Sequence, residues 1–312
     1  MGRLATLIPY MLVVLAPLIW STNFVLGKVL IKDLSPFVIS ACRFGVASVL
    51  LTCLLWFKEG FSLPSPSTWP YIVIAGLTGV FGFNTLIYLG LWYTTSINTS
   101  IINAFNPVLV GILAIVWLKE SLDWKRFGAF FVSILGVFLI TIHGSWKVLI
   151  SLQFNPGDLI IFANTFVWAV YSIAGKKMMQ ELSVLAATTY ANWVGILFLV
   201  PTAYFTWQSG GSPFLNFHIW GGLVYLGIFA SFIAFLSWYY AIDKLGPTVA
   251  SNFYNLIPVF VSILAIVFLG ESIHLYHFIG TLLVLLGIYL GSGYALYIFL
   301  GLKWRILNRR LI

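Results

Sequence analysis

Amide, hydroxyl and indole side chains recur at helical spacing inside long apolar stretches of this sequence. Asn84 and Tyr88 are four residues apart and Asn252 and Asn255 three apart, so each pair shares one face of a helix. Polar groups surrounded by lipid need a partner or a cavity. Uncharged groups of these types suit a zwitterionic or amphipathic solute, whose amine rests on ring faces and whose polar atoms meet amides. The residues predicted to line such a substrate-binding pocket are Trp20, Asn23, Asn84, Tyr88, Asn103, Asn106, Trp168, Tyr171, Trp238, Tyr239, Asn252 and Asn255.

The same polar residues have a simpler interpretation. Any single amide or hydroxyl in a helix bundle can join two helices by a hydrogen bond. The set as a whole favours a pocket, because it gathers on the first, third and fourth apolar stretches of each half of the chain. The two halves also differ, since Asn103 corresponds to Tyr254 and Asn255 to Ala104. An asymmetric lining is typical of a site for an asymmetric solute.

The predicted hinge or gate residues are Gly27, Pro107, Gly175 and Pro258. The prolines fall inside apolar stretches, where proline removes a backbone hydrogen bond and kinks a helix. Packing around a simple bend is the alternative. The glycines lie near the ends of the first and sixth stretches and permit close approach and bending, so these stretches are predicted to act as gates. Asn106 and Asn255 lie close to the prolines and are the first candidates for substrate contact.

Charged residues contribute little to the predicted site. Arg43, about two turns into the second apolar stretch, is assigned a structural role at the membrane boundary. Glu120 ends a stretch and is expected to favour the start of the next helix through its dipole. No Asp or Glu stands in the middle of a stretch, which favours a facilitator or a solute-driven exchanger over proton coupling; coupling through Asp158 or Asp243 is the weaker alternative. No cofactor and no metal ion is expected.

The composition places these residues in lipid. Of the 312 residues, 61% are hydrophobic and 8% charged, whereas about a quarter are charged in an ordinary soluble domain. Continuous apolar runs of about 20 residues favour helices over a barrel, whose strands of about ten residues alternate in polarity. The predicted fold is therefore an all-α integral membrane protein. Ten transmembrane helices are expected to begin near Ile8, Pro36, Pro70, Asn98, Asp123, Gly157, Val184, His218, Pro247 and His274.

The basic residues predict the orientation of these helices. With the N-terminus inside, twelve Lys and Arg residues lie on the cytoplasmic side and three, Lys28, Lys32 and Lys147, lie outside. Both termini are therefore expected in the cytoplasm, with the chain in the cell (inner) membrane. The formal charge of +8 forms no basic face that suits nucleic acid, so the expected partners are lipid and a small-molecule substrate. The sequence does not indicate an oligomeric state.

One apolar segment occurs twice. "NPVLVGILAIVWLKES", which begins at Asn106, and "IPVFVSILAIVFLGES", which begins at Ile257, match at eleven of sixteen positions, 151 residues apart. Earlier in each half, Trp20 and Trp168 correspond at an offset of 148. Each half holds five predicted helices, and an odd number gives the second copy the opposite orientation. The chain is thus predicted to contain two inverted repeats, which supply the two asymmetric states that alternating access requires.

These motifs carry a family resemblance over nearly the whole chain. "LAIVWLKES" and "LAIVFLGES", each after a proline, together with "GTLLVLLGIYL" and "PLIWSTNFVLGK", resemble the EamA-type domain of the drug/metabolite transporter superfamily. The resemblance implies a ten-helix carrier, often an exporter of amino acids or other small metabolites. A flippase for lipid-linked sugars is the alternative within the family. An integral-membrane enzyme is disfavoured, because the sequence shows no catalytic set near the membrane surface.

The predicted organisation follows the repeat. The first EamA repeat is expected at 1–143 and the second at 157–300. A linker at 144–156 joins them, and a basic cytoplasmic tail occupies 301–312.

Overall fold

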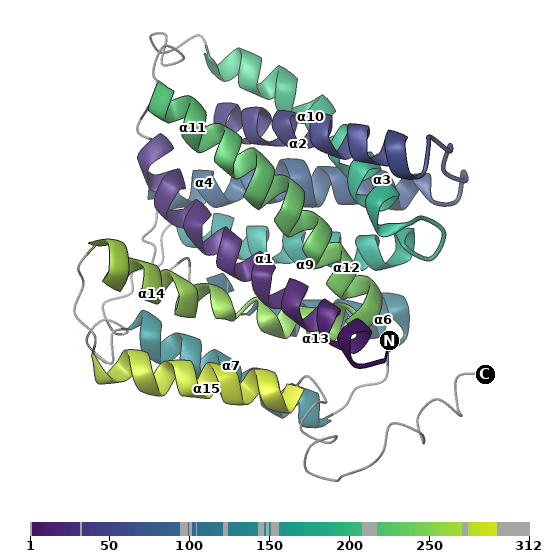
Figure 1. Ribbon diagram of the computed structural model, residues 1–312. Helices are drawn as coiled ribbons and strands as arrows, with labels where there is room; N and C mark the ends of the chain where they lie inside the picture. Colours follow the sequence, from purple (N-terminus) through teal and green to yellow (C-terminus); the bar gives the residue numbers. More distant parts are fainter. Residues whose placement is uncertain are drawn as a thin grey trace.

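The computed structural model describes residues 2–31, 33–93, 99, 102–103, 105–120, 124–142, 147, 150, 156–207, 217–269 and 274–291 (Figure 1). In this part of the chain every regular element is helical, which confirms the prediction of an all-α protein. The tail predicted at 301–312, most of the linker predicted at 144–156 and the helix start predicted near Asn98 lie outside the described residues.

The helices form two similar series. In the first half of the chain they are α1 (Gly2–Leu30), α2 (Pro36–Lys58), α3 (Trp69–Ala75), η1 (Gly76–Gly82), α4 (Phe83–Tyr93), α6 (Asn106–Leu118) and α7 (Trp124–Thr141). In the second half they are α9 (Pro156–Met178), α10 (Val184–Trp207), α11 (Phe217–Tyr225), η3 (Leu226–Ile233), α12 (Ala234–Leu245), α13 (Pro247–Phe253), α14 (Leu256–Leu269) and α15 (Leu275–Gly291). Eight of the predicted starts lie within one residue of an observed one: Pro36, Pro70, Asp123, Gly157, Val184, His218, Pro247 and His274.

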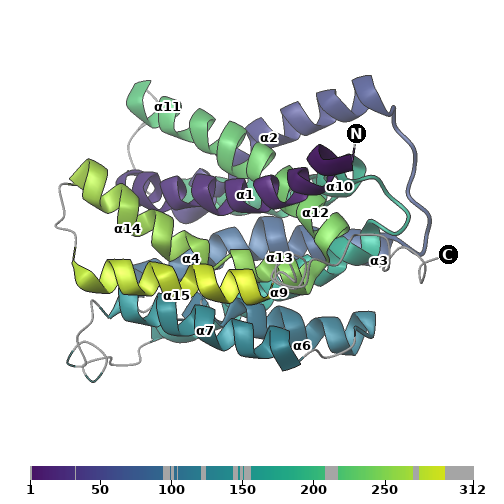
Figure 2. The same ribbon diagram turned by 60° about the horizontal axis from the view of Figure 1, so that its bottom comes forward.

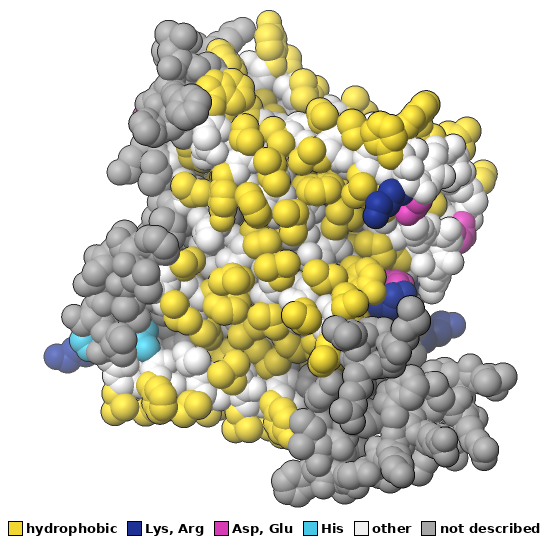
Figure 3. Space-filling model, viewed as in Figure 1, with side chains coloured by type: hydrophobic (Ala, Val, Ile, Leu, Met, Phe, Trp, Pro, Cys, Tyr) yellow, Lys and Arg dark blue, Asp and Glu magenta, His cyan; other side chains and the backbone are white. Residues whose placement is uncertain are grey.

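The molecule carries the apolar belt of a membrane protein. Among the described residues, five helical stretches are long and apolar enough to span a membrane: Pro36–Lys58, Trp69–Gly90, Pro156–Met178, Val184–Trp207 and Ile219–Leu245. Shorter apolar helices cover Leu7–Asn23, Asn106–Leu118, Phe127–Leu139 and Leu275–Gly291. Hydrophobic side chains spread over the broad middle of the face shown in Figure 3, and charged side chains lie toward its left and right margins. Such a belt is compatible with lipid. Its side chains are apolar, and the backbone polar groups of the helices are hydrogen-bonded within each helix.

The main contacts between the halves come in exchanged pairs. α1 packs against α12 and α9 against α4; α2 packs against η3 and α10 against η1; α14 lies on α1 and α6 on α9. Two further pairs join an element to its own counterpart, α2 with α10 and α7 with α15. α7 and α15 run side by side in both views (Figures 1 and 2). α9 lies deepest in the bundle, because it contacts elements of both halves along its length.

Glycines let α7 and α15 approach closely. A Cβ atom on Gly136 would lie 2.5 Å from the backbone oxygen of Gly280, and one on Gly287 would lie 2.5 Å from the backbone nitrogen of Ser133. Gly136 and Gly287 are corresponding positions of the two halves. In a membrane the hydrophobic effect does not bring helices together, because lipid tails are as apolar as the side chains. Small residues let two helix backbones approach closely, so that van der Waals packing holds the helices together.

Two π-helical segments interrupt corresponding helices. η1 separates α3 from α4, and η3 separates α11 from α12. The apolar sequence of these segments gave no signal for the wider turn. π-helical turns are rare and are often found at functional sites, and η3 contributes Ser231 to the site described below.

The helix kinks predicted at the two prolines need correction, because neither proline lies in the interior of a continuous helix. Pro107 occupies the first turn of α6, just after a turn at Phe105. Pro258 is the third residue of α14, and a turn at Tyr254 and Asn255 separates that helix from α13. Proline fits a first turn well, since its missing N–H would have no intrahelical acceptor there. The chain is thus interrupted before each proline. In the described helices, prolines lie in the interior of α1 (Pro9 and Pro17) and of α10 (Pro201).

Candidate functional site

Three predicted site residues meet at the centre of the bundle. Trp20 of α1, Trp168 of α9 and Trp238 of α12 are buried and in ring contact, and we call them the tryptophan cluster. Their ring centroids lie 5.1 Å apart for Trp20 and Trp168, 5.5 Å for Trp20 and Trp238, and 5.7 Å for Trp168 and Trp238. Phe235 and Tyr254 pack against the same rings, 5.9 Å and 5.8 Å from Trp168. Helices from both halves therefore contribute to one aromatic centre.

Several polar atoms beside this cluster have no hydrogen-bond partner among the described residues. They are Nε1 of Trp168 and Trp238 and both amide atoms of Asn164 and of Asn255. By contrast, Nε1 of Trp20 donates to the backbone oxygen of Ala230 at 3.0 Å. A buried polar group left unpaired costs about 1–3 kcal/mol, and nearly all buried polar groups in native proteins have a hydrogen-bond partner in the protein or in ordered water. These atoms are therefore available to a polar solute.

Arg43 lies in the interior of the described bundle, beside two residues predicted to line the pocket. Its side chain is 1% exposed. Nε donates to Oγ of Ser231 at 2.7 Å, and Nη1 donates to Oδ1 of Asn23 at 3.1 Å and to the Tyr88 hydroxyl at 3.2 Å. The Tyr88 hydroxyl in turn donates to Oδ1 of Asn23 at 3.0 Å. We call these four residues the Arg43 cluster.

The second half places different residues at the positions of the Arg43 cluster. At the offsets of 148 and 151, Arg43 corresponds to Ala191, Asn23 to Tyr171 and Tyr88 to Tyr239. Tyr171 and Tyr239 stack with ring centroids 4.7 Å apart. The first-half members of the cluster are thus a cation with two neutral acceptors, and the second-half counterparts of Asn23 and Tyr88 are stacked phenol rings.

The other predicted amides bind protein groups. Nδ2 of Asn84 donates to the backbone oxygens of Gly79 and Val80 at 2.9 Å and 3.1 Å, within the π-helical region. Oδ1 of Asn103 accepts from Thr165 at 3.0 Å, and Nδ2 of Asn106 lies 3.5 Å from the Thr165 backbone oxygen. Nδ2 of Asn252 donates to the backbone oxygen of Gly287 at 3.1 Å. Asn84 thus bonds its own helical stretch, whereas Asn103, Asn106 and Asn252 each contact a neighbouring segment. Oδ1 of Asn106 and of Asn252 has no hydrogen-bond partner among the described residues.

Each predicted gate glycine lies against a tyrosine of its own half. A Cβ atom on Gly27 would lie 3.0 Å from Cε1 of Tyr88, and one on Gly175 would overlap the ring of Tyr239. The glycines therefore let α1 and α9 pass close to the two site tyrosines.

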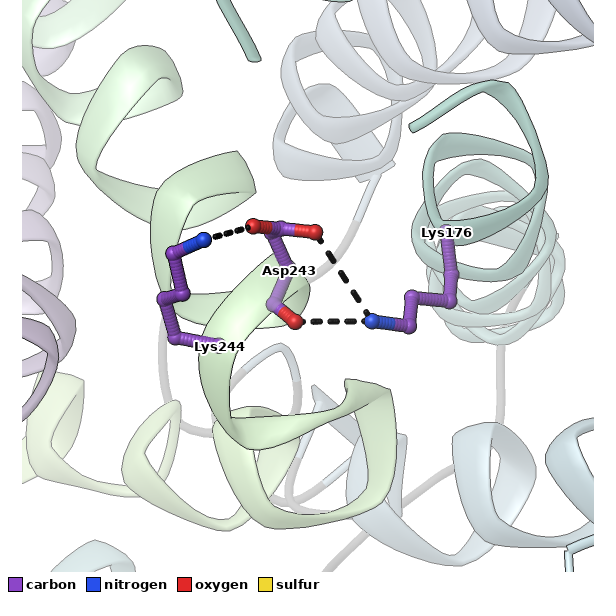
Figure 4. Close-up of polar contacts among 3 residues, drawn as sticks. All are labelled: Lys176, Asp243 and Lys244. Atoms are coloured by element: carbon purple, nitrogen blue, oxygen red, sulfur yellow. Dashed lines mark hydrogen bonds and ion pairs between the residues drawn. The ribbon is translucent and has the colours of Figure 1, made fainter. Parts of the chain in front are cut away.

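One end of the bundle carries charged contacts. Nζ of Lys176 donates to the backbone oxygen of Asp243 at 2.7 Å and lies 3.9 Å from its Oδ1, while Nζ of Lys244 lies 2.7 Å from Oδ2 (Figure 4). Among the ion pairs of the described residues, none involves Arg43. Asp243 thus forms ion pairs with both Lys244 and Lys176 near the ends of α12 and α9.

The same end holds contacts between the two halves. Ser183 donates to Oε2 of Glu59 at 2.5 Å, and Thr248 donates to Oε2 of Glu120 at 2.7 Å. Ser65 and Thr68 donate to the Glu181 carboxylate, and these hydrogen bonds lower the pKa of Glu181 below its usual range. Glu120 therefore bridges to the second half, a contact that its sequence position did not indicate.

The chain is similar to known transporters over most of its length. The model of the EamA-like transporter family matches residues 7–142 and 155–293. The chain is 33% identical over 273 residues to the uncharacterized transporter YyaM of Bacillus subtilis, covering 87% of this chain and 89% of that one.

Two more distant relatives have named substrates. A probable terminal-alkyne amino-acid exporter of Streptantibioticus cattleyicolor is 27% identical, with 83% of this chain and 84% of that one covered. An S-adenosylmethionine/S-adenosylhomocysteine transporter of Chlamydia trachomatis is 28% identical, with 84% and 82% covered.

A solved crystal structure shares the fold. Its TM-score to this chain is 0.75 at 19% identity, and the match covers 94% of this chain and 98% of that one. The two matched segments of the family model coincide with the two helical series, α1 to α7 and α9 to α15. The chain is therefore a membrane protein that belongs to the EamA-like transporter family.

Proposed function

We propose that this chain carries amino acids or similar small metabolites across the cell membrane, in the direction of export. The observation that carries the proposal is the set of unpaired buried polar atoms around the tryptophan cluster, where both halves meet. Indole N–H groups and amides at this place suit a solute with both polar and apolar parts. The relatives that are named for an amino acid and for S-adenosylmethionine, itself an amino-acid derivative, support the substrate class.

Alternating access is the proposed mechanism. The exchanged helix pairs, with α2 on α10 and α7 on α15, are the pattern that a pseudo-two-fold axis between two repeats produces. If each half crosses the membrane five times, that axis lies in the membrane plane and the repeats are inverted. The two halves would then open the central site to one side at a time, with α1 and α9 as gates that bend at Gly27 and Gly175. The helix starts at Pro107 of α6 and Pro258 of α14 would be further hinges.

The proposed carrier is a facilitator or a solute exchanger. The acids with described contacts, such as Glu59, Glu120, Glu181 and Asp243, lie at one end of the bundle, away from the tryptophan cluster. Asp243 is already paired with Lys176, which weakens the case for it as a proton carrier.

Transport by purified protein tests this proposal. Proteoliposomes bearing the wild type or Asn255→Ala would receive radiolabelled tryptophan, phenylalanine and threonine, with and without a pH gradient. We expect saturable flux that the gradient leaves unchanged and that Asn255→Ala lowers about tenfold, because the substrate loses a buried hydrogen bond. An inactive panel would argue against amino acids as cargo, and flux driven by the pH gradient would argue against facilitation.

A further inference from the structure

The Arg43 cluster contains a buried cation whose hydrogen-bond partners are all neutral. Ser231, Asn23 and Tyr88 supply hydroxyl and amide oxygens, and in the described part of the chain Arg43 forms no ion pair. A guanidinium stays protonated in proteins, so its charge cannot be removed by loss of a proton. Buried charges are otherwise paired with an opposite charge. The cluster therefore lacks an anion.

We propose that Arg43 binds the anionic group of the transported solute, which for an amino acid is its α-carboxylate. This inference rests on the proposed function and adds to it the orientation of the substrate. Nη1 of Arg43 is held by Oδ1 of Asn23 and the Tyr88 hydroxyl, two acceptors that a carboxylate can replace. Asn23 is only half-buried, so the cluster reaches the surface of the described bundle at this residue. A carboxylate matches the planar guanidinium and forms shorter and stronger hydrogen bonds than neutral oxygens do.

The cluster adjoins the tryptophan cluster through two rings. Cζ of Arg43 lies 5.1 Å from the ring centroid of Phe44, and the Phe44 and Phe235 centroids are 5.3 Å apart. Phe235 in turn contacts Trp20 at 5.8 Å. A solute whose carboxylate meets Arg43 can therefore extend its apolar part toward the tryptophan cluster.

The difference between the two halves argues against a purely structural role for Arg43. Its counterpart Ala191 packs at the equivalent place, because Gly227 lies against the Arg43 backbone as Gly76 lies against that of Ala191. The same helix contact is thus made with a methyl group in one half and a guanidinium in the other. Helix packing at this place therefore does not need a charge. The charge of Arg43 is available to a ligand that meets different side chains in the two halves of the pathway.

Matched pairs of ligands test the inference on the wild-type protein. Binding to the detergent-purified chain would be measured by isothermal titration calorimetry for tryptophan, phenylalanine and threonine, for their carboxamides, and for inorganic phosphate. Counterflow in proteoliposomes would be measured with the same compounds. We expect each acid that binds to do so about tenfold or more tightly than its carboxamide, because the amide cannot supply the negative charge.

Variants assign that preference to Arg43. Arg43→Gln should bring the acid and its carboxamide to similar affinities, and Arg43→Lys should keep part of the preference. Lys58→Gln, at the exposed end of α2, is the control and should leave the ratio unchanged. If Arg43→Gln fails to fold, the ratio of the affinities for an acid and its carboxamide, measured on the wild type and on Arg43→Lys, still tests the inference.

The outcomes separate this inference from the proposed function. Equal binding and flux of acids and carboxamides by the wild type, or an unchanged ratio in Arg43→Gln, would overturn the role of Arg43 and leave amino-acid transport standing. Absence of binding and flux for every amino acid and carboxamide would overturn both. Phosphate binding that depends on Arg43, in that last case, would assign the cluster to a phosphate-bearing cargo, as in the flippase alternative, and would overturn the carboxylate.

Discussion

Two buried asparagines illustrate the two roles that a polar side chain can have inside a membrane protein. One role is a structural hydrogen bond, and the other is a contact with a solute. The amide of Asn84 donates to two backbone oxygens of its own helical stretch, so its polarity is used by the protein. The amide of Asn164 is buried and has no partner among the described residues. An unpaired buried amide lowers stability, so a protein is expected to retain one such as Asn164 where function requires it.

Replacing each of these amides by leucine gives opposite predictions. Asn164→Leu removes an unpaired buried amide, so the thermal stability of the purified protein should stay level or rise, while amino-acid flux should fall about tenfold or more. Asn84→Leu removes two hydrogen bonds and should lower stability by about 2 kcal/mol. Fluorescence-detected unfolding in detergent, combined with proteoliposome flux, measures both effects. Equal destabilisation by the two substitutions would show that Asn164 serves packing.

At the scale of whole helices, backbone proximity decides which substitutions are tolerated. α7 contains Gly136, which faces the backbone of α15, and Gly128, around which a Cβ atom would meet no atom within 4 Å. Both glycines look alike in the sequence. Their environments differ because only one lies in the interface between corresponding helices of the two halves.

Alanine at these two positions should therefore act differently. Gly136→Ala forces a Cβ atom against the Gly280 backbone, which cannot rotate away, and we expect a loss of about 1–3 kcal/mol of stability. Gly128→Ala should leave stability unchanged or raise it slightly, since alanine favours helix. Thermal unfolding followed by circular dichroism compares the pair. A stable Gly136→Ala protein would mean that α7 and α15 can separate without loss.

Across the whole molecule, the two halves meet at one end through Glu59 with Ser183, Glu120 with Thr248, and Glu181 with Ser65 and Thr68. These contacts join loops and helix ends that belong to different halves. If the halves move against each other during transport, this end must open in every cycle.

A short thiol crosslink at this end should therefore stop transport. Glu59→Cys with Ser183→Cys, on a background in which the free Cys42 and Cys53 are replaced by serine, should lose at least about nine-tenths of its flux on crosslinking and regain it on cleavage of the link. The single variants Glu59→Cys and Ser183→Cys on the same background, treated with the same crosslinker, provide the control and should remain active. Undiminished flux through the crosslinked Glu59 and Ser183 pair would contradict movement of the halves at this end.

The sequence by itself determined the class of fold and, to within one residue, the starts of eight helices. Long apolar runs leave few alternatives in lipid, because every backbone polar group must be bonded within a helix or a closed barrel. The same patterns predicted the family and brought Trp20, Trp168 and Trp238 into one candidate site. Internal repetition also indicated which residues correspond between the halves, such as Gly136 and Gly287.

Only the tertiary structure decided which polar residues share an environment. Arg43 and Ser231 are 188 residues apart in the chain, and their hydrogen bond depends on the packing of α2 against η3. The π-helical turns and the interruptions before Pro107 and Pro258 were hidden for a related reason, since an apolar run has the same composition whether its turns are regular or not. The energetic cost of burying a charge depends on which groups surround it in space. A hydrophobic pattern in the sequence predicts that a residue is buried, but it does not identify those surrounding groups.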